Sequence, residues 1–274
     1  MKAKQKISVI IPMYNAENTV MKALDSVRVQ KGSEYLFEII VVNDGSTDGS
    51  RSVVEKYRKL HPQMNIILLN QDNSGVSKAR NAAMEIATGE FIALLDSDDE
   101  WLPEKTERQM PYLLSKNKNI DFISCRRKNQ KIQLPYVVGK NALAGITFRK
   151  IMLRNEAQPS TVIFKRKILE NTGFFDPNQR YAEDINYWLN ISVKNTMFIL
   201  DEELVIAGGG KRTFGVSGLS ANLAEMEKGL QKNLIEMWSK GRITRGEYFL
   251  YLIFFRIKFA IRVMRNKYLS VQGR

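Results

Sequence analysis

Four carboxylates fall within five residues at positions 96–100, where the sequence reads DSDDE. Carboxylates this close repel one another, and a bound cation is the natural way to neutralise them. Because every candidate ligand atom is an oxygen, a hard ion such as Mg²⁺ or Mn²⁺ suits the cluster better than zinc. The alternative is an acidic turn in solvent that caps the next helix, and the run by itself leaves both interpretations open.

Two other carboxylate groups could take part in chemistry. Asp44, in the run NDGSTD at 43–48, could accept hydrogen bonds from a base or ribose, beside a glycine that permits close approach. The same run is also typical of a turn followed by a helix cap. Glu183 and Asp184 begin a predicted helix, where acidic side chains often only complement the macrodipole. Facing a site, such a carboxylate could act as a general base for a hydroxyl group.

Other kinds of site find little support in the chain. The glycine-rich segment 207–220 matches neither the dinucleotide nor the P-loop motif, although Lys211 and Arg212 within it could close over a phosphate. An ordinary surface loop explains the segment equally well. The single histidine, His61, precedes a proline and indicates a surface turn, so a Ser-His-Asp mechanism is not expected. The single cysteine, Cys125, excludes an intramolecular disulfide and a cysteine zinc cluster.

The elements that must position these groups alternate over the first 125 residues. Strands are predicted at 7–11, 37–42, 65–69, 91–95 and 121–125, and helices at 17–30, 48–60, 76–88 and from 103. Continuous apolar strands between helices indicate a mostly parallel sheet covered on both faces. Ligands of such sheets bind beyond the carboxyl ends of the strands. The polar clusters at 12–17, 43–48 and 96–100 are therefore expected at one edge.

The pattern is weaker after residue 126. A loop or a short hairpin is predicted at 128–140, a long loop at 207–220, strands at 161–164 and 197–200, and helices at 184–193, 222–239 and 244–268. The sequence shows no internal repeat and no low-complexity tract.

The net charge of +13 first suggests a polyanionic partner, and residues 241–274 carry +7 of it. In this tail, eight apolar residues at 248–255 precede basic residues interleaved with apolar ones. The apolar run within 244–268 is too short to span a bilayer, but the stretch suits a helix that lies in a membrane interface. Packing on the rest of the chain, or on a second subunit of a homo-oligomer, is the alternative. No nucleic-acid motif accompanies the basic residues, so nucleic acid is not an expected partner.

Four ordered motifs together carry a family resemblance. They are ISVIIPMYN at 7–15, IVVNDGSTD at 40–48, NSGVSKARN at 73–81 and GEFIALLDSDD at 89–99. Their order and spacing closely resemble the family 2 glycosyltransferases of GT-A fold. Glu183 and Asp184, followed by Trp188, extend the match to about residue 200. The last seventy residues lie outside it.

The resemblance implies an α/β chain with a GT-A, Rossmann-like fold, in which helices flank a mostly parallel sheet and a helical extension follows. We expect a catalytic domain at 1–215, with a nucleotide-binding half at 1–125 and an acceptor half at 126–215. A basic, amphipathic helical extension is expected at 216–274.

The family also implies transfer of a sugar from a nucleotide-diphosphate donor, expected to be a UDP-sugar, to an acceptor hydroxyl with inversion. Position by position, the resemblance implies the following roles: Pro12, Tyr14 and Glu17 in the first nucleotide-binding loop; Asp44 on the base; Lys78 and Arg80 near the diphosphate; Asp96 beside the nucleotide; Asp98 on ribose or metal; Asp99 on Mn²⁺ or Mg²⁺; and Asp184 as catalytic base beside Glu183. A histidine that the family often has in the later loop is missing, and Lys211 and Arg212 could substitute for it.

The chemistry agrees with these roles. Negative charge develops on the diphosphate as the glycosidic bond breaks, and a divalent ion stabilises that charge. A carboxylate on the opposite side accepts the acceptor's proton as attack proceeds. One base and one cation suffice for a single displacement, so no nucleophilic serine or cysteine is needed.

We therefore expect a bacterial-type enzyme of surface-polysaccharide synthesis, acting on O-antigen, capsule or a teichuronic-type polymer. A lipid-linked acceptor, and a cytoplasmic enzyme held peripherally on the inner face of the plasma membrane, would explain the basic tail. One rival is a sugar-phosphate nucleotidyltransferase, but residues 12–16 lack the glycine-rich, basic loop that it needs. Another is an inactive carbohydrate- or lipid-binding adaptor, against which the intact carboxylates Asp44, Asp98, Asp99 and Asp184 argue.

Overall fold

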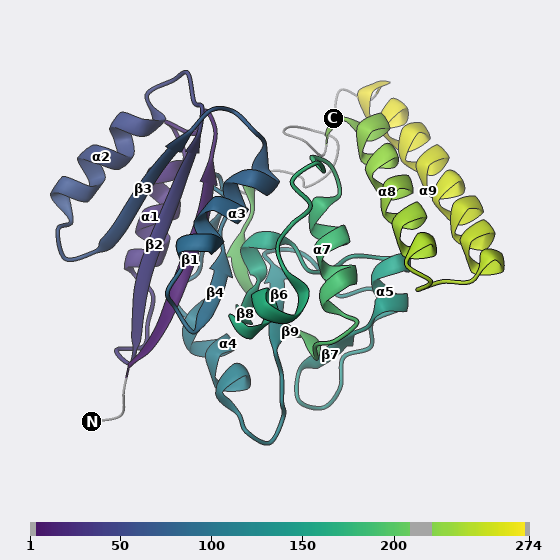
Figure 1. Cartoon of the computed structure of the whole chain (residues 1–274), viewed down its shortest axis with the longest axis horizontal. Helices are drawn as coiled ribbons and strands as arrows, with labels where there is room; N and C mark the ends of the chain where they lie inside the picture. The colour runs from purple at the N-terminus through teal and green to yellow at the C-terminus, as the bar shows by residue number, and fades with distance from the viewer. Residues whose placement is uncertain (1–3, 209–220, 272–274) are drawn as a thin grey trace.

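The computed structural model describes the backbone of residues 4–208 and 221–271, and the side chains of these residues as far as 266 (Figure 1). The strands are β1 (Gln5–Met13), β2 (Tyr35–Asp44), β3 (Asn65–Gln71), β4 (Phe91–Leu94), β5 (Glu100–Trp101), β6 (Phe122–Arg127), β7 (Leu143–Ile146), β8 (Ile163–Lys165) and β9 (Met197–Ile206). The helices are α1 (Val20–Arg28), α2 (Ser50–Leu60), α3 (Val76–Ile86), α4 (Lys105–Leu114), α5 (Phe148–Leu153), α6 (Lys167–Thr172), α7 (Glu183–Ile191), α8 (Leu223–Ser239) and α9 (Arg245–Val271).

These strands form one nine-stranded sheet in the order β3-β2-β1-β4-β8-β6-β9-β5, with β7 beside β9. Strand β1 is parallel to β2 and β4, and β2 is parallel to β3. The antiparallel β8 joins β4 to β6, so β6 and its parallel neighbour β9 run in the same direction as β1. Only β5, β7 and β8 run the other way within the described chain, which confirms the predicted mostly parallel sheet.

Helices cover both faces of the sheet because successive strand residues point to opposite sides. Ile10 and Ile40 belong to one buried cluster with residues of α3, α7, α8 and α9. Val9, Ile11 and Val41 belong to a second cluster with residues of α1, α2 and α4. Burial on both faces explains why these strands read as continuous apolar runs.

The second half contains elements that the sequence pattern did not predict. Strand β7 has four residues, and α5 and α6 have six each, so none carries enough periodicity to be recognised. The strand predicted at 161–164 begins instead at Ile163, after a 3₁₀ turn at Pro159–Thr161. Strand β9 extends to Ile206, beyond the predicted 197–200, because its polar residues 201–203 interrupt the apolar run while its pairing continues.

The two C-terminal helices lie side by side as a hairpin next to α7 and α5 (Figure 1). Helix α8 begins at an Asn222 cap, whose side-chain oxygen accepts a hydrogen bond from the Glu225 amide at 3.2 Å. A buried face of α9, centred on Phe255, joins the larger core cluster. No helix in the described part of the chain is both long enough and apolar enough to cross a membrane.

Candidate active site

The carboxyl ends of β1, β2, β4 and β6 meet at one edge of the sheet, since these strands run in one direction. Two loops at this edge are tied together. The Asn15 amide donates to Ser46 Oγ at 3.0 Å, and the Gly49 amide donates to Glu17 Oε2 at 2.7 Å. Pro12 is buried beneath the first loop, whereas Tyr14 is half-exposed above it. The first predicted nucleotide-binding loop is therefore held firmly against the second.

Asp44 organises the next loop. Its Oδ1 accepts hydrogen bonds from Gln71 Nε2 at 2.7 Å and from the Ser74 amide at 2.8 Å. Its Oδ2 accepts from the Gly75 amide at 2.9 Å. Gly75 has a φ of 92°, which favours glycine there and brings its amide to the carboxylate. These bonds fix the start of α3, from which Lys78 extends into solvent.

Arg80 lies under the site, joining two motifs that are far apart in the sequence. Its Nη2 donates to Asp96 Oδ1 at 2.7 Å, and its Nη1 donates to Glu183 Oε1 at 2.9 Å. Burial would lower the pKa of Arg80, but the two carboxylates raise it above its ordinary value. Arg80 is only 2% exposed and both of its Nη atoms are taken up by Asp96 and Glu183, so here it holds these two carboxylates together, and its predicted place near the donor diphosphate stays a prediction.

Asp98 and Asp99 differ in their surroundings. Asp98 is exposed, whereas Asp99 is buried and its Oδ1 accepts a hydrogen bond from the Gly208 amide at 2.7 Å. Burial, together with the charges of Asp96 and Asp98, raises the pKa of Asp99 to about 7. Burial and the neighbouring charges make the ionised form of Asp99 costly. A bound cation would favour that form, so the position suits a cation.

The protein supplies only part of a metal shell. Among the described residues, no group of three or more His, Cys, Asp or Glu side chains is arranged to hold a metal ion. Mg²⁺ sites commonly use one or two carboxylates and complete the shell with substrate phosphates and water. Asp98 and Asp99 therefore fit an ion that is bound together with a diphosphate substrate.

Asp184 lies in the first turn of α7, directly after Glu183 and two residues after Ala182, whose φ of 54° turns the chain into the helix. Its Oδ2 accepts a hydrogen bond from Asn155 Nδ2 at 3.0 Å. Burial, together with the nearby charge of Glu183, raises the pKa of Asp184 to about 7. A carboxylate with a pKa near neutrality has the properties of a general base.

Arg127 is a candidate site residue that the sequence analysis did not name. It ends β6 at the same sheet edge, and its Nε donates to Gln130 Oε1 at 3.0 Å. Burial lowers the pKa of Arg127, while the charges of Asp99, Glu156 and Asp184 oppose that shift. Arg127 is thus within electrostatic reach of both key carboxylates. The available signal was its place two residues past a predicted strand.

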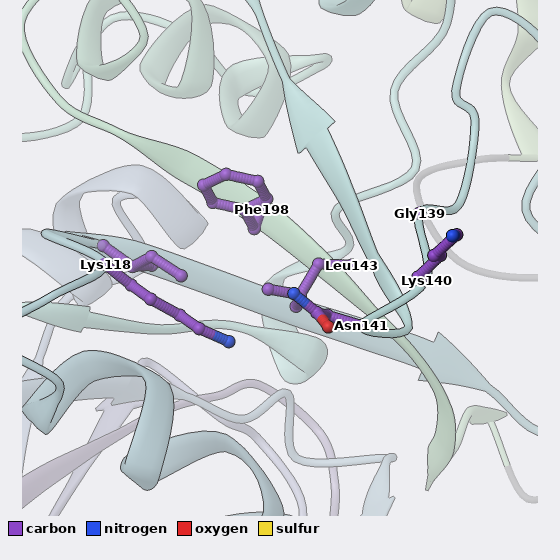
Figure 2. A pocket seen from close by; sticks show the side chains of 7 residues that line it. Lys118, Gly139, Lys140, Asn141, Leu143 and Phe198 are labelled. Atoms are coloured by element: carbon purple, nitrogen blue, oxygen red, sulfur yellow. The ribbon is translucent and has the colours of Figure 1, made fainter.

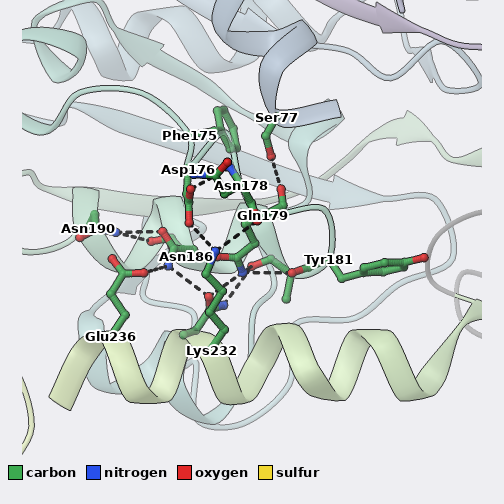
Figure 3. A network of polar contacts seen from close by, with 12 residues as sticks. Ser77, Phe175, Asp176, Asn178, Gln179, Tyr181, Asn186, Asn190, Lys232 and Glu236 are labelled. Atoms are coloured by element: carbon green, nitrogen blue, oxygen red, sulfur yellow. Dashed lines mark hydrogen bonds and ion pairs between the residues drawn. The ribbon is translucent and has the colours of Figure 1, made fainter. Parts of the chain in front are cut away.

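Helix α8 supports the segment that leads to Asp184 (Figure 3). Gln179 Nε2 donates to Asn233 Oδ1 at 2.7 Å, and Asn233 Nδ2 donates to the Ala182 carbonyl at 2.9 Å. Helix α8 lies so close to this segment that a Cβ on Gly229 would be 2.2 Å from the backbone carbonyl oxygen of Tyr181. Helix α8 therefore packs directly on α7 and on the segment that precedes it. Lys211 and Arg212, the predicted phosphate-contacting pair, lie outside the described residues.

An open pocket of about 300 Å³ lies away from this edge (Figure 2). Its walls are Ile120, Leu143 and Phe198, with Lys118 and Lys140 at its margin. None of the described site residues lines it, so the pocket has no part in the chemistry considered above.

Comparisons with solved structures place this architecture in the GT-A fold. A mannosyltransferase from Pyrobaculum calidifontis, solved with GDP-Man and Mn²⁺, superposes with a TM-score of 0.68 over 99% of this chain and 80% of that one. The sequence identity is 18%, so this likeness concerns the fold alone.

The profile of "Glycosyl transferase family 2" matches residues 8–185, and the chain belongs to this family. The putative teichuronic acid biosynthesis glycosyltransferase TuaG of Bacillus subtilis is 32% identical over 70% of this chain and 73% of its own length. The UDP-Glc:α-D-GlcNAc-diphosphoundecaprenol β-1,3-glucosyltransferase WfgD of Escherichia coli is 31% identical over 70% and 71%. Other relatives are longer: the match covers 34% of an uncharacterised glycosyltransferase of Rickettsia felis.

Proposed function

We propose that this protein is an inverting, metal-assisted glycosyltransferase that moves a hexosyl group from a UDP-sugar to an acceptor hydroxyl in cell-surface polysaccharide synthesis. The observation that carries the proposal is the buried link Asp96–Arg80–Glu183, which joins the acidic cluster to the residue beside Asp184. The names of TuaG and WfgD support the polymer and the donor class, respectively.

The donor would bind across the tied loops at the sheet edge. Asp44, with Pro12, Tyr14 and Glu17, would form the nucleoside side, and the exposed Lys78 would face the diphosphate. Asp98 and Asp99 would hold Mn²⁺ or Mg²⁺, which supplies positive charge against the departing diphosphate. Arg80 would keep Asp96 in place from below without touching the donor.

Asp184 would act on the acceptor. As the acceptor oxygen attacks the anomeric carbon, the bond to the diphosphate breaks and the hydroxyl proton passes to a carboxylate oxygen of Asp184. Attack from the side opposite the leaving group inverts the anomeric carbon. Asn155 bonds one Asp184 oxygen and would orient the other toward the acceptor, while Arg127 would balance the charges on both sides of the reacting bond.

The location that we propose is the cytoplasmic face of the plasma membrane. One face of α9 packs on α8 and α5, and its opposite face exposes a stripe of apolar side chains. This apolar stripe consists of Leu250, Ile253, Ile257, Ile261 and Met264. Arg256 and Arg265 are exposed beside it. An apolar stripe bordered by cations suits the interface of an anionic bilayer and would bring the site to a lipid-linked saccharide.

The test is turnover with a panel of UDP-sugars in the presence of Mn²⁺. We expect UDP release with one donor, stimulated by the metal in the wild type and not in Asp99→Ala. A matched carboxylate variant on α4, Glu107→Ala, should behave as the wild type. Full metal-dependent activity of Asp99→Ala would remove the metal assignment. UDP binding without turnover would favour the adaptor, and formation of pyrophosphate would favour the nucleotidyltransferase.

A further inference from the structure

A second pocket lies beside Asp184, between α5, α7, α8 and α9. Asn155, which bonds Asp184, and Ile185, which follows it, are both part of the pocket wall. The pocket therefore adjoins the proposed base, on the side formed by the C-terminal helices. Nothing in the donor chemistry proposed above uses it.

Three basic side chains and one acidic side chain line the pocket, and one of the basic ones, Arg154, is ion-paired with Glu156. Lys258 and Arg262 lie one turn apart on the inward face of α9, and Arg154 lines the pocket from the end of α5. Lys258 Nζ donates to the Leu153 carbonyl at 2.9 Å, which fixes the side chain toward the pocket. Burial, together with the charges of Arg262 and Arg154, lowers the pKa of Lys258 to about 8, although the charges of Glu156 and Glu227 oppose the shift. An anion placed here would relieve both effects.

One wall also offers a hydrogen-bond acceptor. Glu227 is 4% exposed, and its Oε1 accepts a hydrogen bond from Gln231 Nε2 at 3.1 Å. Its Oε2 is buried and accepts none from the described residues. A buried carboxylate oxygen without a donor is costly, and a sugar hydroxyl in the pocket would satisfy it.

The size of the pocket fits a small anionic group. Its volume is about 50 Å³. Since one water needs 10–15 Å³ of such volume, there is room for roughly four waters or one phosphate group.

We propose that this pocket binds the phosphate of a phosphorylated saccharide acceptor, with Lys258 and Arg262 on the phosphate and Glu227 on a hydroxyl group. The assignment rests on the proposed function, because it places the acceptor sugar next to Asp184. It also gives the two faces of α9 separate roles. The inward face would bind the anion, and the outward face would contact the membrane.

The test is acetylation of Lys258, followed by mass spectrometry, in protein saturated with UDP and Mg²⁺ so that the donor site is occupied. Glucose 1-phosphate at about twice its Kd should slow acetylation of Lys258 about threefold, whereas glucose should not. Lys59, exposed on α2, serves as the control in the same sample and should react equally throughout. Arg262→Met should lose the protection, and Arg58→Met should keep it.

Two results would overturn the assignment. Equal acetylation of Lys258 with glucose 1-phosphate and with glucose would exclude a phosphate site. Equal protection by glycerol 3-phosphate would assign the pocket to a lipid headgroup instead. Circular dichroism checks that Arg262→Met is folded. UDP binding, measured in the same samples, keeps this test separate from the proposed function. A lack of UDP binding would count against the proposed function and would leave the assignment of the pocket unaffected.

Discussion

Two carboxylates with similar pKa values have opposite tasks in the proposed reaction. Burial raises the pKa of Asp99 and of Asp184 to about 7 in each case. Asp99 lies in an acidic cluster that a cation would neutralise, whereas Asp184 is paired with the uncharged Asn155. A cation bound with the diphosphate keeps Asp99 ionised, and Asp184 remains available to take up a proton.

The rate of transfer should therefore depend on the ionisation of Asp184. Because only the carboxylate can accept a proton, the maximal rate at saturating donor and metal should rise with pH up to about pH 7. It should fall about tenfold per unit below that. The measurement is the pH profile of kcat, with UDP binding followed at each pH as the control. A flat profile across the neutral range, with donor binding intact, would contradict the role of Asp184.

Lys105 is a buried cation that the site does not use. Its Nζ lies 4.0 Å from the centre of the Trp101 ring and has no hydrogen-bond partner among the described residues. Burial lowers the pKa of Lys105 to about 8, so the folded state bears a penalty for its charge at any pH below 8.

Lys105→Met should remove that penalty while keeping most of the volume. We expect the free energy of unfolding at pH 7 to increase by about 1–3 kcal/mol, measured by urea denaturation. The gain should shrink gradually as the pH rises from about 8 to 10.5, because the wild-type lysine then loses its proton on folding at a cost that falls with pH. Lys59→Met, at an exposed position, should change stability by less than about 0.5 kcal/mol. A destabilised Lys105→Met would show that the ring contact outweighs desolvation.

Residue types and spacing predicted the acidic cluster and the two other carboxylate motifs, because their chemistry is local. The position of Arg80 was not predictable, since its partners Asp96 and Glu183 come from distant parts of the chain. Arg127 was missed because an arginine at a strand end has no distinctive spacing.

At the scale of elements, the site depends on helix α8, which lies outside the matched family region. Asn233 and Gln179 join α8 to the turn before α7, and Asn186 Nδ2 donates to Glu236 Oε2 at 2.6 Å. The close approach at Gly229 leaves no room for a side chain. Helix α8 thus fixes the angle at which α7 presents Asp184.

Gly229→Ala should displace α7 and disturb catalysis. Because the new Cβ would meet a backbone oxygen, we expect a loss of about 1–3 kcal/mol in unfolding free energy. Transfer should fall further than donor binding does, as measured by turnover and UDP titration.

Gly246→Ala provides the matched control, because nothing lies within 4 Å of the position of its Cβ in α9. This change should leave activity intact and stabilise the helix by up to about 1 kcal/mol. Equal behaviour of the two variants would mean that α8 does not position α7.

Long, apolar elements were predicted well and short ones were not. The first-half strands and the helices flanking them occur where periodicity indicated, because burial on both faces leaves an unbroken apolar run. Strands β5 and β7 and helices α5 and α6 exist through pairing and packing with distant segments. Their stability comes from tertiary contacts that a sequence window does not contain.

For the whole molecule, the distribution of charge and apolar surface is more informative than the total of +13. The two faces of helix α9 differ in chemistry. Lys258 and Arg262 line the pocket on its inner face, and the apolar stripe lies on its outer face. The sequence left open whether this helix meets a membrane, the catalytic domain or another subunit. The inner face of α9 packs on α8 and on the end of α5, and the outer face is exposed and could contact a further partner.

The double variant Ile253→Glu with Ile257→Glu should weaken binding to anionic vesicles at least tenfold, because each change removes apolar area from the stripe and adds negative charge. Flotation with vesicles containing phosphatidylglycerol measures the binding. Leu36→Glu with Leu60→Glu, at exposed positions on β2 and α2, should bind as the wild type does. The contrary outcome has two parts: the Ile253→Glu, Ile257→Glu variant floats as the wild type does, and it loses a dimer that the wild type forms. That outcome would make the apolar stripe an interface between two copies of the chain.

The most direct test of the central claim compares Asp184→Asn with the wild type, using the UDP-sugar that supports turnover. The account predicts that the asparagine variant binds UDP within about twofold of the wild type but transfers sugar about 10²–10⁴ times more slowly, since only proton acceptance is lost. A variant that binds the donor normally and keeps the wild-type rate of transfer would contradict the assignment of Asp184 as the base.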